Sequence, residues 1–149
     1  DAVDSGASVG FLPPLDRDEA AGYWQSVEMA VRHHEVLLLA ARDEHGVLGT
    51  VQLLLPGKPN ARHRAEVRKL LVNRRARRRG VGRSLMQAVE VQSAALGRTM
   101  LVLDTRKGDA AEKLYVHMCY HRAGEIPRYA RSANGELHTT VFFWRELGG

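Results

Sequence analysis

The sequence has few cysteines and no long hydrophobic run. Cys119 is the only cysteine among 149 residues, which excludes a disulfide within the chain and is typical of a reducing compartment such as the cytoplasm. The longest apolar run, residues 36–41, is far shorter than the roughly 20 residues that cross a bilayer as a helix. We therefore expect a cytoplasmic protein with no membrane partner, stabilised by its own hydrophobic core.

Positive charge is concentrated in one segment of the chain. The net charge is +5, but residues 62–83 hold ten Lys or Arg side chains against a single acid, Glu66, so this window alone carries +9. Aromatic residues, which make up only 6% of the chain, are absent from the window. Nucleic-acid binders usually spread basic residues over a face and add aromatic side chains that stack on bases. The distribution therefore favours a compact anionic ligand over nucleic acid.

The hydrophobic patterns predict one α/β domain over residues 1–149. A loop precedes a helix that begins after Asp16, with Glu19 placed as in a capping box, and Gly97 and Asp109 mark the end of one later helix and the start of another. The expected helices cover residues 17–33, 80–96 and 110–120, and the expected strands lie within residues 35–56 (two strands), 64–73, 99–104, 123–130 and 137–147. The first three strands form an antiparallel meander, and the run at 99–104 is typical of a strand buried on both faces. This order predicts a mixed, mostly antiparallel central sheet flanked by helices.

The segment "RARRRGVGRSLM", residues 75–86, lies between an expected strand and an expected helix. A helix N-terminus offers unpaired amide groups and partial positive charge, and glycines there allow a ligand to approach the backbone. Arginine side chains add bidentate phosphate donors. The segment fits neither Gly-x4-Gly-Lys-[Ser/Thr] nor Gly-x-Gly-x-x-Gly, which excludes the two familiar nucleotide-binding loops. It therefore predicts a cradle for one or two phosphates, and its alternative is a solvated basic turn.

Two motifs in order resemble those of the GNAT acetyltransferase superfamily. "RRRGVG", residues 77–82, is similar to its [Arg/Gln]-x-x-Gly-x-[Gly/Ala] signature, and "AEKLYVHMCY", residues 111–120, to its Ala-x-x-Leu-Tyr-x-x-x-Gly-[Phe/Tyr] segment. The resemblance implies acetyl-CoA as co-substrate and no metal. It implies that the pantetheine arm lies along Leu70, Leu71 and Val72, and that the pyrophosphate is bound by Arg77, Arg78, Arg79, Gly80, Val81, Gly82, Arg83 and Ser84.

The chain departs from the family pattern at two positions. Cys119 stands in place of the usual glycine, so we expect a slightly changed geometry at the end of the preceding helix. Gly108 stands where many members place an asparagine that contacts CoA, so that contact is not expected here.

Within the superfamily, the chain most resembles the tabtoxin resistance acetyltransferase group. The shared segments include "SGASVGF", "RAEVRKLLV", "LDTRKGDAAEKLY" and "GEIPRYA". The family's fold opens with a strand and a helix, so we expect roughly thirty further residues upstream of Asp1 and an unpaired edge on the first strand here. The resemblance implies transfer of an acetyl group to a primary amine of a small molecule, such as an amino-acid-like antibiotic or toxin, by a monomer or homodimer. The alternatives are acetylation of a protein or peptide amine, and a non-enzymatic module that binds RNA or an acidic protein.

Three residues are candidates for the chemistry of acetyl transfer. Tyr115 occupies the family's general-acid position, and a phenol with a pKa near 10 can protonate a departing thiolate; its alternative is a core tyrosine. Glu66, the only acid of the basic window, is our candidate base, directly or through water, and its alternative is an ion pair with Arg64 or Arg68. Asp104 ends a buried strand, where open sheets place ligands, and is expected to bind the substrate ammonium unless it caps the next loop.

Overall fold

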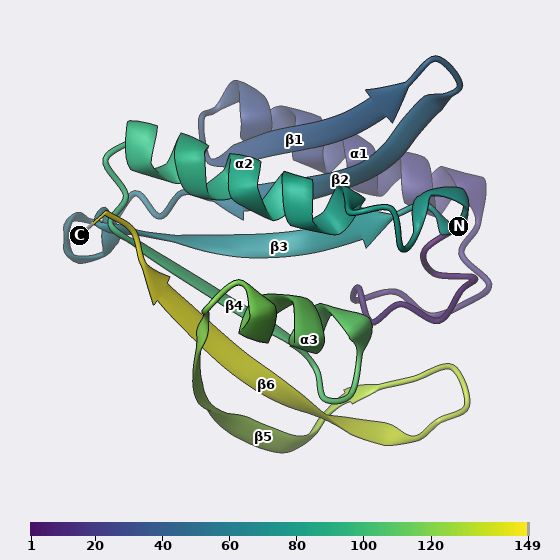
Figure 1. The fold of residues 1–149 in the computed structure, drawn as a ribbon. Helices are drawn as coiled ribbons and strands as arrows, with labels where there is room; N and C mark the ends of the chain where they lie inside the picture. Colours follow the sequence, from purple (N-terminus) through teal and green to yellow (C-terminus); the bar gives the residue numbers. More distant parts are fainter. Residues whose placement is uncertain (149) are drawn as a thin grey trace.

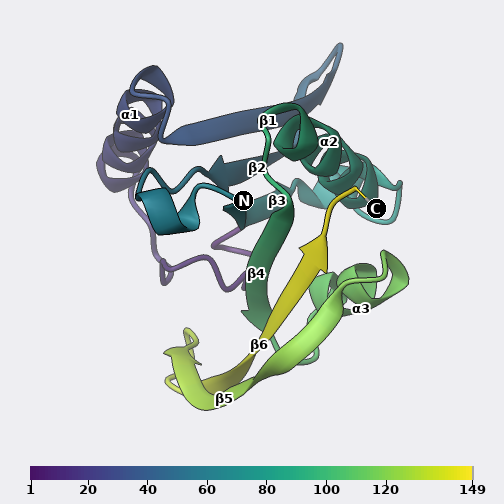
Figure 2. The same cartoon turned by 90° about the vertical axis from the view of Figure 1, so that its left-hand side faces the viewer.

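The computed structural model describes residues 1–148 as a six-stranded sheet between helices (Figure 1). The helices are α1 (Arg17–Arg32), α2 (Val81–Ala95) and α3 (Ala110–His117), with short 3-10 turns η1 (Pro59–Ala61) and η2 (Arg74–Ala76). The strands are β1 (Val36–Asp43), β2 (Gly46–Leu54), β3 (Arg64–Val72), β4 (Met100–Arg106), β5 (His121–Arg131) and β6 (Leu137–Glu146). Helices α2 and α3 lie on one face and α1 on the other (Figures 1 and 2).

The strand order is β1-β2-β3-β4-β6-β5, and every neighbouring pair is antiparallel except β3 with β4. This confirms the predicted mixed, mostly antiparallel sheet. Within the described residues β1 pairs only with β2 and so forms an edge of the sheet, as expected. No helix within residues 1–148 is both long enough and apolar enough to cross a membrane.

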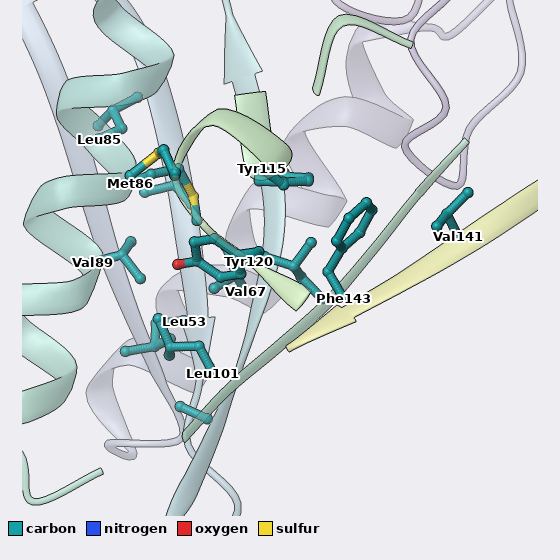
Figure 3. Close-up of a cluster of buried hydrophobic side chains, with 14 residues drawn as sticks. Leu53, Val67, Leu85, Met86, Val89, Leu101, Tyr115, Tyr120, Val141 and Phe143 are labelled. Carbon is teal, nitrogen blue, oxygen red and sulfur yellow. The ribbon is translucent and has the colours of Figure 1, made fainter. Parts of the chain in front are cut away.

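The main core lies between the sheet and the helices α2 and α3. Alternate residues of the strands point to this face, including Val51, Leu53, Leu101 and Phe143, and all are almost fully buried (Figure 3). The matching stripe on α2 is spaced for one helical face, and it consists of Leu85, Met86, Val89 and Ser93. Each large apolar side chain buried in this way contributes about 1.5–3 kcal/mol to folding.

The contact between β3 and β4 is short. The two parallel strands pair only through Arg64, Ala65 and Glu66 on β3 and through residues 100–102 on β4. Beyond Glu66, residues 67, 68, 71 and 72 of β3 pair with β2, and no residue of β3 pairs with β4. The sheet is therefore split at the carboxyl ends of its two parallel strands, and unpaired backbone groups of β3 line the split.

All three α-helices end in the same hydrogen-bonded arrangement. In each, the amide two residues beyond the C-cap donates to a carbonyl in the last turn, and the preceding amide closes a smaller loop. This Schellman motif places one residue in the left-handed region. That residue is His34 in α1, Gly97 in α2 and Cys119 in α3, with φ of 60°, 72° and 63°. The prediction that Cys119 changes the geometry was therefore wrong, because cysteine adopts the conformation that glycine usually takes.

Other local predictions succeeded or failed for identifiable reasons. Asp16 caps α1 as predicted, and its carboxylate accepts from the amide of Glu19 at 2.7 Å. Asp109 occupies the N-cap position of α3, but its carboxylate accepts from Nε of Arg106 at 2.9 Å and caps no amide. Helix α3 ends at His117 because Cys119 turns the chain, whereas the sequence predicted residue 120. Strand β4 is fully buried only on the face of Leu101 and Leu103.

Candidate active site

The segment between β3 and α2 presents a run of free backbone amides. Gly80 is the N-cap of α2 and has φ 78°, a conformation in which glycine carries no steric cost. Arg78, two residues before it, also has a positive φ of 60°. The first amide of α2 to find a partner is that of Ser84, which donates to the carbonyl of Gly80. Across the described part of the chain, the six amides of residues 78–83 donate to no protein acceptor, so they are available to an anion.

The structure divides the arginines of this segment into two groups. Arg74 pairs with Asp1 at 2.6 Å, and Arg75 pairs through two nitrogens with Asp43. Arg77 donates to the hydroxyl of Ser5 at 2.6 Å and to the carbonyl of Val72 at 3.4 Å. The second group makes no side-chain hydrogen bond with any described residue, and it consists of Arg78, Arg79 and Arg83. These three exposed cations flank the free amides, at the place where the sequence predicted a phosphate cradle.

A bulge in β3 shapes the wall of the split. Between the pairs Gln52 with Arg68 and Thr50 with Leu71, one residue of β2 opposes two residues of β3. Lys69 takes up the extra residue with φ 51°, so that it and the pantetheine candidates Leu70, Leu71 and Val72 follow a bent path. Leu70 packs against the core, and Leu71 lines a cavity on the opposite face.

Lys69 itself is a half-buried cation beside the split. Its ammonium donates to the carbonyl of Val9 and lies 5.9 Å from the ring centroid of Phe11. Burial, together with the positive charge of Arg68, lowers the pKa of the Lys69 ammonium, while Asp104 acts in the opposite direction. Sequence reasoning assigned Lys69 no role of its own, since nothing in "RAEVRKLLV" shows where a strand pair will slip.

Tyr115 projects from α3 into the core beside the split (Figure 3). Its side chain is only 4% exposed, and its ring lies 5.8 Å from those of Tyr120 and Phe143. The hydroxyl of Tyr120 donates to Glu90 at 3.0 Å, whereas that of Tyr115 has no hydrogen-bond partner among residues 1–148. Burial, and then the negative charge of Asp104, raise the pKa of Tyr115 above that of an ordinary phenol. The phenol therefore holds its proton and keeps it free for a ligand.

The two acidic candidates occupy the strands that separate. Glu66 forms the last pair of the β3–β4 ladder with Val102. Both of its carboxylate oxygens accept from Arg68, at 2.9 and 3.2 Å, so the ion pair that the sequence left open is present. Asp104 lies two residues further along β4 and accepts from the hydroxyl of Thr140 at 2.7 Å. Neither Thr105 nor Arg106 receives a cap from the Asp104 side chain.

The structure brings these candidates to one place. Residues 70–72 and Asp104 lie on the separated ends of β3 and β4, and Glu66 forms the last pair before the strands separate. The loop of residues 78–83 follows β3, and the charge of Asp104 acts on Tyr115. Within the described range, no group of three or more His, Cys, Asp or Glu side chains is arranged to hold a metal ion. The arrangement combines a run of free amides, an unpaired strand edge and a buried phenol.

Comparisons with known proteins show which family the sequence matches. A sequence model described as the acetyltransferase (GNAT) family matches residues 9–119. The chain is 32% identical over 109 residues to an Azospirillum brasilense protein named as an uncharacterized N-acetyltransferase in the hisH-hisA intergenic region. That match covers 72% of this chain and 63% of the relative, so the chain spans less than two thirds of the relative's length.

Solved structures share the fold over nearly the whole chain. An N-acetyltransferase from Staphylococcus aureus Mu50 has a TM-score of 0.82 at 21% identity, over 99% of this chain and 87% of its own. A ribosomal-protein-alanine N-acetyltransferase from Brucella melitensis has a TM-score of 0.80 at 21% identity, over 98% and 88%. Salmonella typhimurium YncA, described with its cofactor acetyl-CoA, has a TM-score of 0.78 at 16% identity, over 99% and 83%. At such identities the likeness establishes the fold and leaves the substrate open.

Proposed function

The chain belongs to the acetyltransferase (GNAT) family, and we propose that it is an N-acetyltransferase that moves an acetyl group from acetyl-CoA to a primary amine of a small molecule. The observation that carries this proposal is the split between β3 and β4, which leads directly to the six free amides of residues 78–83. A solvated basic turn requires neither feature. The residues present fit a ligand with a diphosphate at one end and an amide-containing arm at the other.

The cofactor side of the proposed site consists of a loop and a strand edge. The loop comprises Arg77, Arg78, Arg79, Gly80, Val81, Gly82, Arg83 and Ser84. Its free amides and the side chains of Arg78, Arg79 and Arg83 would bind the pyrophosphate of acetyl-CoA. The backbone of Leu70, Leu71 and Val72 would bind the amides of the pantetheine arm, as another strand would. When bound, acetyl-CoA supplies the thioester that carries the acetyl group.

The proton transfers fall to two side chains. We assign Tyr115 as the general acid, because its unpartnered hydroxyl and raised pKa keep a proton available for the leaving thiolate. We assign Glu66 as the base that accepts the amine proton, directly or through water. Its pairing with Arg68 keeps the carboxylate ionised. A Glu66→Gln variant that retains full turnover would remove the base role.

The acceptor side is assigned to Asp104, whose carboxylate retains acceptor capacity beyond its bond with Thr140. A carboxylate there can hold a substrate ammonium before it is deprotonated. The resemblance to the tabtoxin resistance group supports an amino-acid-like antibiotic or toxin as the acceptor, and hence a resistance enzyme of the cytoplasm. A peptide amine is the competing acceptor, and a direct comparison of substrates separates the two.

Calorimetric titration with acetyl-CoA tests the cofactor site. We expect saturable binding to the unmodified chain and roughly tenfold weaker binding to Arg79→Ala, because a charge-assisted phosphate contact is lost. Arg75→Ala removes the same charge from the same segment, but Arg75 is already paired with Asp43, so its binding should change little. Absence of binding by the unmodified chain, or equal losses in both variants, would contradict the proposed cradle.

Thiol release from acetyl-CoA then tests the acceptor. The panel contains free amino acids, an amino-acid-like antibiotic, a polyamine and a peptide with an N-terminal alanine. Because Cys119 is exposed and free, a protein-only sample corrects for its reaction with the thiol reagent. Turnover confined to the peptide would contradict a small-molecule acceptor. Binding of acetyl-CoA without turnover of any amine would contradict the assignment of the protein as an acetyltransferase.

A further inference from the structure

Residues 1–11, here called the N-terminal segment, form part of a cavity wall. The segment lies outside all helices and strands and passes beside the carboxyl ends of β3 and β4, where Lys69 and Arg106 donate to it (Figures 1 and 2). Together with α1, β2 and β3 it encloses a cavity of about 390 Å³ on the face of the sheet opposite α2. Val3 and Phe11 from the segment, Tyr23 from α1 and Lys69 from the bulge line this cavity. The segment therefore shapes the space next to the split on the acceptor side.

Basic side chains from distant parts of the sequence hold the N-terminal segment in place. Arg77 Nη2 donates to the hydroxyl of Ser5 at 2.6 Å. Arg106 at the end of β4 donates to the carbonyl of Gly6 at 3.4 Å, and Lys69 of β3 donates to that of Val9. These contacts come from the two strands that separate and from the loop between β3 and α2. The segment thus bridges the split and is fastened on both sides of it.

Arg74 of η2 also holds the segment, since its backbone amide and its Nε donate to the carboxylate of Asp1 at 3.0 and 2.6 Å. Arg77 differs from Arg74, Arg106 and Lys69 because it directly precedes the loop of free amides. Its guanidinium reaches back to Ser5 and to the carbonyl of Val72 on β3, which directs its charge away from residues 78–83. The neighbouring Arg78 and Arg79 have no such partners among residues 1–148 and remain available to phosphate. The side chain of Arg77 therefore binds the N-terminal segment, although Arg77 is the first residue of the proposed phosphate loop.

We infer that Arg77 is a positioning residue that couples the phosphate loop to the acceptor-side wall through Ser5. This inference rests on the proposed function, since it assigns the loop to acetyl-CoA and the cavity side to the amine. A ligand bound to the loop restricts the motion of the backbone that carries Arg77. Through the Arg77–Ser5 hydrogen bond, residues 1–11 then become less mobile as well. Bound acetyl-CoA therefore improves the binding of the amine, and by linkage the amine improves the binding of acetyl-CoA by the same factor.

Hydrogen exchange of the ligand-free protein tests the fastening without any need for activity. We expect Ser5→Ala and Arg77→Met each to speed amide exchange in residues 1–11 by roughly tenfold, since a hydrogen bond to a charged group is lost. The double variant should exchange no faster than Arg77→Met alone. Arg78→Met, which removes the same charge one residue away, should leave this exchange unchanged. Equal exchange in Ser5→Ala and the unmodified chain would overturn the fastening.

Binding and kinetics test the coupling. For Arg77→Met and Ser5→Ala we expect the acceptor KM to rise several-fold while the Kd for acetyl-CoA stays within twofold, and Arg78→Met should show the reverse. If Arg77→Met weakens acetyl-CoA as strongly as Arg78→Met does, Arg77 is a phosphate ligand and the inference is wrong. A chain that binds no acetyl-CoA would refute the proposed function, and the exchange results would still decide whether Arg77 holds the segment.

Discussion

Replacing Cys119 by glycine is expected to stabilise the protein, because the end of α3 holds a side chain where the backbone is left-handed. Cys119 has φ 63° and supports the Schellman motif through its own amide and that of Tyr120. A residue with a Cβ costs about 1–2 kcal/mol in this conformation. Glycine removes that cost, but it also increases the conformational entropy of the unfolded chain, which lowers the stability of the folded state by about 0.5–1 kcal/mol. The net expectation is about 0.5–1 kcal/mol of added stability.

Urea unfolding followed by circular dichroism measures this difference, with the slope m checked for constancy. Cys119→Ala is the matched control, because it removes the thiol but keeps the Cβ and therefore the strain. Gly97→Ala, at the equivalent position of α2 with φ 72°, should lose a similar amount of stability. The reasoning is refuted if Cys119→Gly is no more stable than Cys119→Ala, or if Gly97→Ala costs nothing.

Three further predictions address the site and its support. Tyr115→Phe should lower kcat by roughly 10²–10⁴ with little change in acetyl-CoA affinity. Because the pKa of Tyr115 is raised, this group should cause no loss of kcat in the unmodified protein up to about pH 10. Steady-state kinetics across pH measure both effects. Gly49→Ala should destabilise by about 1–3 kcal/mol in urea unfolding, because the added Cβ would lie 2.6 Å from the carbonyl oxygen of Leu71; an unchanged midpoint would show that β2 and β3 can separate. Arg79→Ala should bind acetyl-CoA with a weaker salt dependence than the unmodified chain, as titrations at two ionic strengths would show.

The order of elements could be predicted because each leaves a local pattern. The helical stripe of α2, the cap at Asp16 and the turn glycine Gly97 are all encoded within a few residues of where they act. The run of free amides at residues 78–83 was predictable for the same reason, since it lies where a strand, a glycine-containing turn and a helix follow one another in the sequence. The family model matches residues 9–119, a range that contains residues 77–82 and all but the last residue of 111–120.

The remaining features depend on contacts that no local pattern reveals. The bulge at Lys69 arises from the register between β2 and β3, which the sequence of either strand alone leaves open. Ser5 and Arg77 are far apart in sequence, so their hydrogen bond follows from the path of the N-terminal segment. The left-handed turns at His34 and Cys119 were missed because neither residue is glycine. The sequence therefore indicated candidate residues for the site, but not the long-range contacts between them.

The short ladder between β3 and β4 has a thermodynamic consequence. Three residue pairs are the only strand pairing that joins β1–β3 to β4–β6 within the described chain. A ligand whose arm pairs with the free edge of β3 and also contacts β4 acts as a removable extra strand between two half-sheets. Binding of such a ligand therefore raises the free energy of unfolding of the sheet, and this increase grows with the logarithm of the ligand concentration. Empty and loaded protein should accordingly differ most in the protection of their β3 and β4 amides.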